Sequence, residues 1–520
     1  MELKHTAQEW LAVAQAQLAG GSPAAAQAIL TRALAEHPGA RELRRARAGL
    51  LQQLGHTSES ESLLRDLLDS DPGDVAVAFT LARMLQERGR MAAAASILLT
   101  CFAQTSNRAD ANLAIDAIEL LDDCDRKSDA ASIAAAALEA NPRDSRLHAY
   151  AGMLQIQLGA FDRARQHYLF ALEHDPRALE WHIPIGLASA QRYEDRAHPD
   201  FALFRNGLIH PDLSEPARAE LHFALGKAYD DIGDYAKATQ NFRTGNAIRK
   251  LDSAWSRKAW RRTVEARLAA RSVARPLQPS PDFTPLFIVG MPRSGTTLLA
   301  GQLSCYPGVR NRGELPWIAK LSQQSELAAE SDHAALTRAA TFYAAQARRD
   351  DAGDARWFLD KQPLNFRYVD LILAMFPHAK IVYCVREPRD TALSLWMQCF
   401  LEAVQGYSYD FADIALVMRD CERLMARWHV RYQGSIRTVR YEDLVTSPQE
   451  TVAVLAEWIG IPNDADSRSA PVATTTGTAI STASLWQARQ PVNTRSVLRW
   501  KNYVPFVPEL LNLPNVSQSF

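Results

Sequence analysis

The sequence predicts a multidomain protein, with an N-terminal all-α repeat solenoid followed by a C-terminal α/β domain that has a parallel sheet. Two patterns lead to this fold class. Glycine, small-residue and proline markers recur at a fixed phase in the first half, and apolar strand-like runs alternate with helical patterns in the second half. The length of 520 residues agrees, because a single hydrophobic core usually stops growing well before that size.

The repeat markers start with Gly21, Gly55 and Gly89, which are 34 residues apart. Gly159 and Gly233 continue the set, and a small residue stands five positions after each of the five glycines, namely Ala26, Ser60, Ala94, Ala164 and Ala238. In the clearest repeats a proline follows the glycine by 17 residues. Glycine ends one helix, the small residue lets two helices approach closely, and proline marks the turn to the next repeat. A period of 34 with helix–turn–helix character is that of the tetratricopeptide repeat.

We therefore predict a tetratricopeptide-repeat array over residues 1–255. The matching repeats are 5–38, 39–72, 73–106, 143–176 and 219–250, and we expect degenerate helical pairs at 107–142 and 177–218. Such arrays form a concave groove that typically binds peptide or protein segments. We expect a protein partner there, and the groove would recruit a substrate, mediate self-association or serve only as a scaffold.

Residues 256–282 are predicted to be a basic, proline-rich linker to a domain at 283–520. Lysine and arginine dominate between Arg257 and Arg275, with Trp255 and Trp260 nearby. Such a run is either a patch that faces an anionic ligand or the solvated face of a helix between two domains, and we favour the second interpretation.

The second domain opens with PLFIVGMPRSGTT, from Pro285 to Thr297. An apolar, β-branched run predicts a buried strand, two glycines bracket a tight loop, and a helical pattern follows. This order makes an anion cradle, with backbone N–H groups and the helix dipole facing a phosphate. The expected binding residues are Arg293, Ser294, Gly295, Thr296 and Thr297. The nucleoside-triphosphate loop has Lys where this chain has Thr296, which argues against ATP or GTP hydrolysis.

Four motifs in order make this P-loop-like domain resemble the sulfotransferases, closest in pattern to the tyrosylprotein sulfotransferases. They are PRSGTT, DKQP, FPHAKIVYCVREPRDTALS and the late segment SLWQARQPVNTRSVLRW, and the resemblance covers residues 283 to about 510. It implies an enzyme that uses 3′-phosphoadenosine 5′-phosphosulfate (PAPS) as co-substrate and transfers its sulfuryl group to an acceptor hydroxyl, with a protein or peptide tyrosine as the favoured acceptor.

The resemblance also implies roles for single residues. Arg386 and Ser394 would bind the 3′-phosphate of the nucleotide, and Lys361 would contact the transferring sulfuryl group. Ser484 and Arg499 match two positions of the late segment, although the family typically has Lys at the second. Tyr441 matches a tyrosine at the nucleotide site, and a buried structural tyrosine is the competing interpretation.

The resemblance places the general base at Glu314, in the context Asn311-Arg312-Gly313-Glu314. A carboxylate there would accept the proton of a phenol, whose reference pKa is about 10. Arg293, Lys361, Ser484 and the loop N–H groups would stabilise charge on the leaving oxygen. No metal is expected, because these fixed cations would neutralise that charge. A solvent-exposed glutamate at a helix start is the competing interpretation of Glu314.

Composition narrows the setting of the protein. The net charge of −1 gives no general attraction to nucleic acid, and no apolar run approaches the length of a membrane span. The start of the chain lacks a signal-peptide pattern, and six scattered cysteines suit a reducing compartment. We expect a cytoplasmic, bacterial protein. Besides a sulfotransferase, a P-loop nucleotide kinase or NTPase on a repeat scaffold and a non-catalytic repeat adaptor stay open. Thr296 argues against the kinase, and the retained polar positions argue against the adaptor.

Overall fold

The computed structural model describes residues 5–269, 277–278, 283–323, 333–349, 353, 355–400, 403–462 and 492–513. Contacts divide the chain into two compact units, residues 1–150 with 349–351, and residues 151–348 with 352–520. The division falls inside the predicted repeat 143–176. The compact units therefore differ from the predicted domains, whose boundaries stay a prediction.

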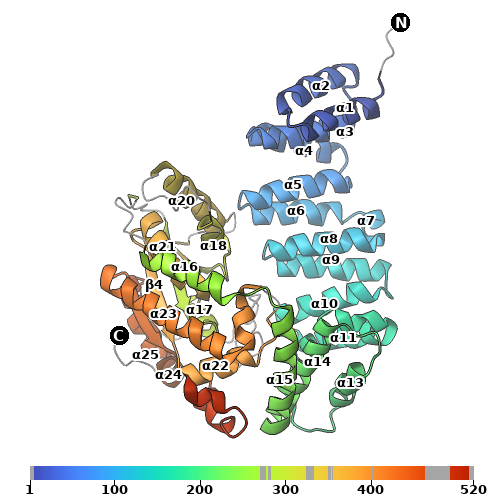
Figure 1. The fold of residues 1–520 in the computed structure, drawn as a ribbon. Coiled ribbons are helices and arrows are strands. Elements are labelled where there is room, and N and C mark those ends of the chain that lie inside the picture. The colour runs from blue at the N-terminus through green and yellow to red at the C-terminus, as the bar shows by residue number, and fades with distance from the viewer. Residues whose placement is uncertain are drawn as a thin grey trace. The chain divides into compact units, whose positions relative to one another are not determined.

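Antiparallel helical pairs build the first part of the chain (Figure 1). Up to residue 140 the helices are α1 (Ala7–Ala19), α2 (Pro23–Glu36), α3 (Arg41–Gln53), α4 (Thr57–Ser70), α5 (Val75–Glu87), α6 (Met91–Cys101), α7 (Thr105–Ala109), α8 (Ala111–Asp123) and α9 (Lys127–Ala140). They continue with α10 (Ser145–Leu158), α11 (Phe161–His174), η1 (Pro176–Glu180), α12 (Ile183–Ser189), α13 (Pro199–Leu208), α14 (Glu215–Asp231) and α15 (Tyr235–Asp252). The five predicted repeats each hold one such pair.

The sequence markers have the physical roles expected of them. Gly21, Gly55 and Gly89 have φ of 74°, 82° and 76°, in the left-handed region that glycine enters at little cost. The small residues five positions later are buried where the two helices of each pair meet.

The expected degenerate pair at 107–142 is a regular pair, α8 and α9, with its phase displaced. The short helix α7 precedes it, and Asp125, with φ of 58°, takes the place of the marker glycine. Ala130 follows five residues later and is fully buried, and Pro142 follows 17 residues later. The markers are present, 36 rather than 34 residues after those of the preceding repeat.

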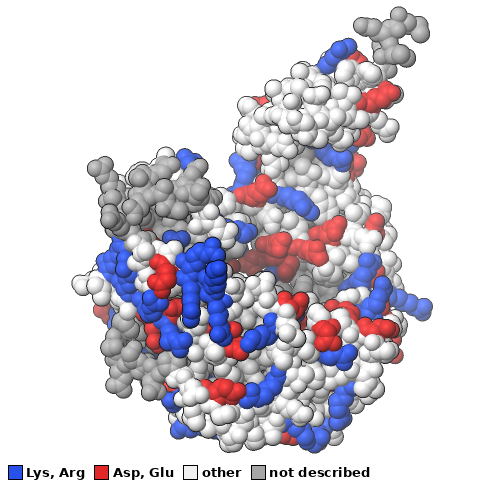
Figure 2. Space-filling model, viewed as in Figure 1, with Lys and Arg blue, Asp and Glu red and all other residues white. Residues whose placement is uncertain are grey.

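The basic stretch forms helix α16 (Arg257–Ala269), which packs on α23 (Phe411–Arg431) of the second unit. Arg257 pairs with Asp413, and the Trp260 indole donates a hydrogen bond to Asp420 over 2.9 Å. Figure 2 shows basic side chains gathered over α16 and α23. This agrees with the favoured interpretation of a helix with a solvated face. The proline-rich remainder of the predicted linker lies largely outside the described residues.

The predicted parallel sheet is confirmed as five strands in the order β2-β3-β1-β4-β5, all parallel. The strands are β1 (Thr284–Gly290), β2 (Val309–Asn311), β3 (Trp357–Asp360), β4 (Lys380–Val385) and β5 (Ile436–Arg440). The other elements are α17 (Thr296–Leu303), α18 (Trp317–Leu321), α20 (His333–Arg348), η2 (Pro363–Tyr368), α21 (Val369–Met375), α22 (Pro388–Trp396), η3 (Ala403–Tyr409), α24 (Tyr441–Thr446), α25 (Pro448–Ile459), η4 (Arg499–Asn502) and η5 (Pro508–Asn512).

Helices cover both faces of this sheet. Leu286 and Ile288 of β1 pack on one face into a core with α17, α24 and α25. Phe287 points to the other face, where its ring lies 5.7 Å from that of Tyr343 in α20. Because both faces are covered, ligands have access to the sheet at its edges, and in parallel sheets they bind at the carboxyl edge.

Candidate functional site

The carboxyl ends of the five strands gather most of the predicted site residues at one edge of the sheet. The glycine loop follows β1, and Arg386 follows β4 directly. Lys361 follows β3, Glu314 stands three residues after β2, and Tyr441 follows β5. Residues as far apart in the sequence as Arg293 and Tyr441 therefore share one edge because the strands are parallel.

The loop after β1 has the backbone of an anion cradle. Arg293 has φ of 71° and Gly295 has φ of 93°, so two left-handed residues close a tight turn before α17. Gly295 has no side chain to cap this helix, and its first N–H groups lack intrahelical acceptors. Ser294 and Thr296 are buried within the same turn. The arrangement can accept a phosphate or sulfate oxygen at the helix start.

Gly290→Ala is expected to destabilise the fold by at least about 3 kcal/mol, because a Cβ there would lie 2.3 Å from the carbonyl oxygen of Cys384 at φ of 141°. Gly460→Ala is the matched control, since Gly460 has φ of 89° but no atom within 4 Å of the added Cβ. That variant should lose about 1 kcal/mol. Urea unfolding of both variants measures the difference, and equal losses would contradict the close approach of β1 to β4.

Arg386 joins the loop to the rest of the edge. Its guanidinium donates hydrogen bonds to the carbonyl oxygens of Arg293, at 2.9 Å, and Ser496, at 2.6 Å. Arg293 Nε donates to Ser394 Oγ over 2.9 Å. The two residues that the resemblance assigns to a 3′-phosphate, Arg386 and Ser394, thus both contact Arg293, and the structure brings them together.

Tyr441 packs between the loop and Arg386. The Arg386 guanidinium lies 4.5 Å from the centre of the Tyr441 ring, a cation–π contact. A Cβ on Gly295 would come within 2.6 Å of the same ring, so Gly295 allows the tyrosine to approach the loop. Tyr441 therefore lies at the site, and its contacts are those of a residue that shapes the cradle.

The electrostatics of this edge favour an anion. Burial, together with the nearby charges of Arg386 and Arg499, lowers the pKa of Arg293 to about 10. Burial also lowers the pKa of Arg386. Two buried polar atoms, Ser294 Oγ and Arg386 Nε, have no hydrogen-bond partner among the described residues. Crowded cations and unpaired donors in one buried place are stabilised by a ligand with several acidic oxygens, and a nucleotide phosphate has this chemistry.

Glu314 and Lys361 form the second half of the edge. The Lys361 ammonium contacts Glu314 Oε1, and the lysine side chain is 3% exposed while that of the glutamate is 28% exposed. A buried cation thus lies beside a carboxylate that solvent or a substrate can reach. This geometry can hold a proton acceptor and a positive charge within one reaction site.

Asp360 is a site residue that the sequence interpretation did not include, although it belongs to the quoted DKQP motif. Its carboxyl is buried and accepts hydrogen bonds from the Tyr343 hydroxyl, at 2.8 Å, and the Leu315 N–H, at 3.3 Å. Because it precedes Lys361 and binds the residue after Glu314, Asp360 fixes both ends of their contact. Burial raises its pKa to about 7.

Because the Asp360 pKa is raised on folding, its contribution to stability is full below pH 4 and is lost as the pH rises through about 7. Asp360→Asn should remove this dependence. We expect the thermal midpoint of the wild type to fall by several degrees more than that of the variant between pH 5 and 8.5. Asp212→Asn, at an exposed position, should behave like the wild type. Parallel curves for wild type and Asp360→Asn would contradict the burial argument.

Two predicted residues come from the late segment. Arg499, in η4, pairs with Asp230 of α14, and it lies close enough to Arg293 and Arg386 to lower the pKa of both. Ser484 lies outside the described residues. No group of three or more His, Cys, Asp or Glu side chains in the described part of the chain is arranged to hold a metal ion.

Comparison with known proteins agrees with the two-part organisation. Residues 285–466 match the sulfotransferase family, and residues 17–78 match the tetratricopeptide repeat. Both resemblances inferred from the motifs are confirmed. Across the described residues, we find no helix with the length and apolar character that crossing a membrane requires.

Relatives cover parts of the chain. An uncharacterized protein of Aquifex aeolicus is 28% identical over 334 residues, which are 59% of this chain and 42% of that protein. Protein-tyrosine sulfotransferase 1 of Danio rerio is 25% identical over 261 residues, 45% of this chain and 70% of that enzyme. A solved sulfotransferase domain from the olefin synthase of Synechococcus PCC 7002 is 20% identical, with a TM-score of 0.34, and covers 45% of this chain and 91% of that domain. The chain thus spans less than half of the first relative's length.

Proposed function

The chain carries tetratricopeptide repeats and a domain of the sulfotransferase family, and from this premise we propose that it transfers a sulfuryl group from PAPS to a tyrosine hydroxyl of a protein or peptide. The observation that carries the proposal is the carboxyl edge of the sheet. Arg386, Lys361 and Glu314 each follow a different strand there, and these strands lie on either side of β1, which leads into a glycine loop with the backbone of an anion cradle.

In the proposed complex, Arg386, Ser394 and Arg293 hold the 3′-phosphate, and the N–H groups at the start of α17 hold the 5′-phosphosulfate. When bound, the nucleotide would supply the activated sulfuryl group. Tyr441 fills the space beside Arg386 and Gly295 and keeps the guanidinium in place. A triphosphate lacks a lysine partner in this loop, because Thr296 stands at that position.

Glu314 takes the proton of the acceptor hydroxyl as general base. Its side chain is the more exposed member of the pair with Lys361, so an acceptor can reach it from solvent. Lys361 and the loop N–H groups stabilise the negative charge that develops on the oxygen between sulfur and the 5′-phosphate, as the acceptor oxygen displaces adenosine 3′,5′-bisphosphate from the sulfur. Asp360, which accepts hydrogen bonds from the Tyr343 hydroxyl and the Leu315 N–H, holds Glu314 and Lys361 in position.

A protein or peptide acceptor is supported by two features. The repeat array belongs to a class that binds protein segments, and one relative is a protein-tyrosine sulfotransferase. Both features concern the acceptor alone, so the nucleotide site and the acceptor class can be tested apart.

The test uses the full chain, PAPS labelled with ³⁵S, and three peptides that differ only in having Tyr, Ser or Phe at one position. We expect label on the Tyr peptide and none on the Phe peptide. Label on the Ser peptide alone would contradict the tyrosine acceptor and leave sulfotransfer standing. Phosphate transfer from ATP to any peptide, with no sulfur transfer, would contradict the proposed activity.

A further inference from the structure

The late segment is bound to the carboxyl edge of the sheet on one side. The Ser496 carbonyl accepts a hydrogen bond from Arg386, and the N–H groups of Leu498 and Trp500 donate to the two carboxylate oxygens of Asp390 over 2.7 and 2.9 Å. Leu498 has φ of 58°, a conformation that is strained for a residue with a side chain. This turn directs the N–H groups of residues 498 and 500 to Asp390 and leaves Arg499 between them.

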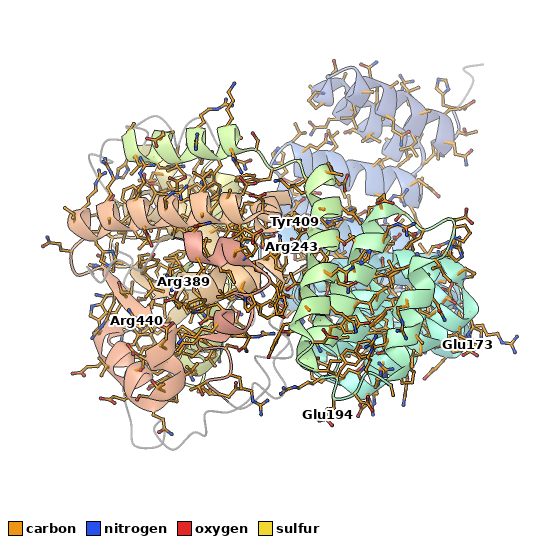
Figure 3. All side chains as sticks on the ribbon, turned by 60° about the horizontal axis from the view of Figure 1, so that its bottom comes forward. Glu173, Glu194, Arg243, Arg389, Tyr409 and Arg440 are labelled. Atoms are coloured by element: carbon orange, nitrogen blue, oxygen red, sulfur yellow. The ribbon has the colours of Figure 1, made fainter. Side chains whose placement is uncertain are left out.

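Arg499 and the chain that follows the late segment, as far as Glu509, are bound to the last helical pair, α14 and α15. Asp230 of α14 accepts hydrogen bonds from Arg499 and, with its second oxygen, from the Tyr503 hydroxyl. Tyr235 packs on Tyr503, with ring centres 5.0 Å apart. Arg243 of α15 donates to both carboxylate oxygens of Glu509, at 2.8 and 3.0 Å. Figure 3 shows Arg243 where α15 meets the catalytic part of the second unit.

Asp230 therefore lies beside the arginine cluster of the proposed nucleotide site. Its side chain is only 7% exposed, and Arg499 is the cation that it holds beside Arg293 and Arg386. Three arginines repel one another, and a flexible arginine without an anchor would turn towards solvent. Asp230 opposes this by binding one nitrogen of the Arg499 guanidinium. Among the described residues no other hydrogen bond of that group is found, so its remaining donors can serve a ligand.

We propose that Asp230 is a positioning residue for the nucleotide, so that the helical pair α14–α15 forms part of the sulfotransferase site rather than a separate binding module. The inference rests on the proposed nucleotide site. It assigns a role in nucleotide binding to a residue of the repeat region, about 50 positions before the catalytic domain begins.

The test is a double-mutant cycle on the full chain, read by calorimetric titration with adenosine 3′,5′-bisphosphate. Asp230→Asn should weaken binding by about tenfold, and Arg499→Gln should weaken it by at least as much. The double variant should bind like Arg499→Gln alone, because Asp230 acts through Arg499. Glu509→Gln is the matched control, since it removes the ion pair between Glu509 and Arg243 but leaves Arg499 untouched. It should bind within about twofold of the wild type.

The outcomes distinguish a positioning role of Asp230 from competition with the ligand for Arg499 and from general docking. Unchanged or tighter binding by Asp230→Asn would overturn the inference, and tighter binding would show that Asp230 competes with the ligand for Arg499. An equal loss in Glu509→Gln would also overturn it, because general docking would then be responsible. If Asp230→Asn does not fold, Tyr503→Phe removes the second bond on Asp230. It should weaken binding by about threefold, and this effect should be absent in an Arg499→Gln background. A wild type that binds no bisphosphate would instead refute the proposed function itself.

Discussion

Lys361→Ala is expected to lower the rate of sulfuryl transfer by about a thousandfold, the effect of removing one preorganised charge from a reaction site. Two changes combine in this variant. The site loses the buried ammonium that we propose stabilises the leaving oxygen, and Glu314 loses the contact that holds its carboxylate. Bisphosphate binding should change far less than turnover, because the phosphate contacts belong to other strands.

Single-turnover rates with saturating PAPS measure this effect. Lys258→Ala is the control, since Lys258 is exposed on α16 and away from the sheet edge. It should keep the wild-type rate. A Lys361→Ala variant that keeps more than about a tenth of the wild-type rate would contradict the assigned role.

Arg386→Ala is expected to weaken binding of adenosine 3′,5′-bisphosphate by about 30- to 100-fold, as the loss of charge-assisted hydrogen bonds in a buried site predicts. Arg386 also holds the backbone of Arg293 and Ser496, so its removal loosens the loop and the late segment together. Arg386→Lys should recover little affinity, because an ammonium cannot make the forked contacts of a guanidinium.

Arg440→Ala is the matched control for this variant. Arg440 ends β5 next to Tyr441, yet its side chain is 48% exposed (Figure 3). Its removal should change the affinity by less than about twofold. Equal losses for Arg386→Ala and Arg440→Ala would indicate a general electrostatic attraction in place of a defined phosphate contact.

The sequence predicted the fold class because its markers carry local physical constraints. A glycine in the left-handed conformation and a buried small residue five positions later indicate one helical pair, and recognising that pair needs no information from distant residues. The prediction depended on these local markers, and this explains why residues 107–142 were assigned as a degenerate pair. There Asp125, in place of glycine, has the left-handed conformation, and α7 displaces the phase by two residues. A search that allowed Asn or Asp at the glycine position and a variable period would have found that pair.

The site was predictable where a motif lies next to a strand end, as for Arg386 and Lys361. Asp360 was missed because a carboxylate at a strand end is recognised as buried only once its partners are known, and Tyr343 is 17 residues away. The pairing of Arg499 with Asp230 joins positions 269 residues apart, and no local pattern reports it. Residue roles beyond these placements stay predictions.

Calorimetric titration of the wild-type chain with adenosine 3′,5′-bisphosphate and, separately, with ATP and Mg²⁺ tests the central claim most directly. The sheet edge combines a cradle without the triphosphate lysine and a half-buried pair of arginines, Arg293 and Arg386, beside Ser394. We therefore predict micromolar or tighter binding of the bisphosphate and at least about a hundredfold weaker binding of ATP with Mg²⁺. Preferential binding of ATP with Mg²⁺ would contradict the account and favour a nucleotide kinase, and binding of neither ligand would favour an adaptor.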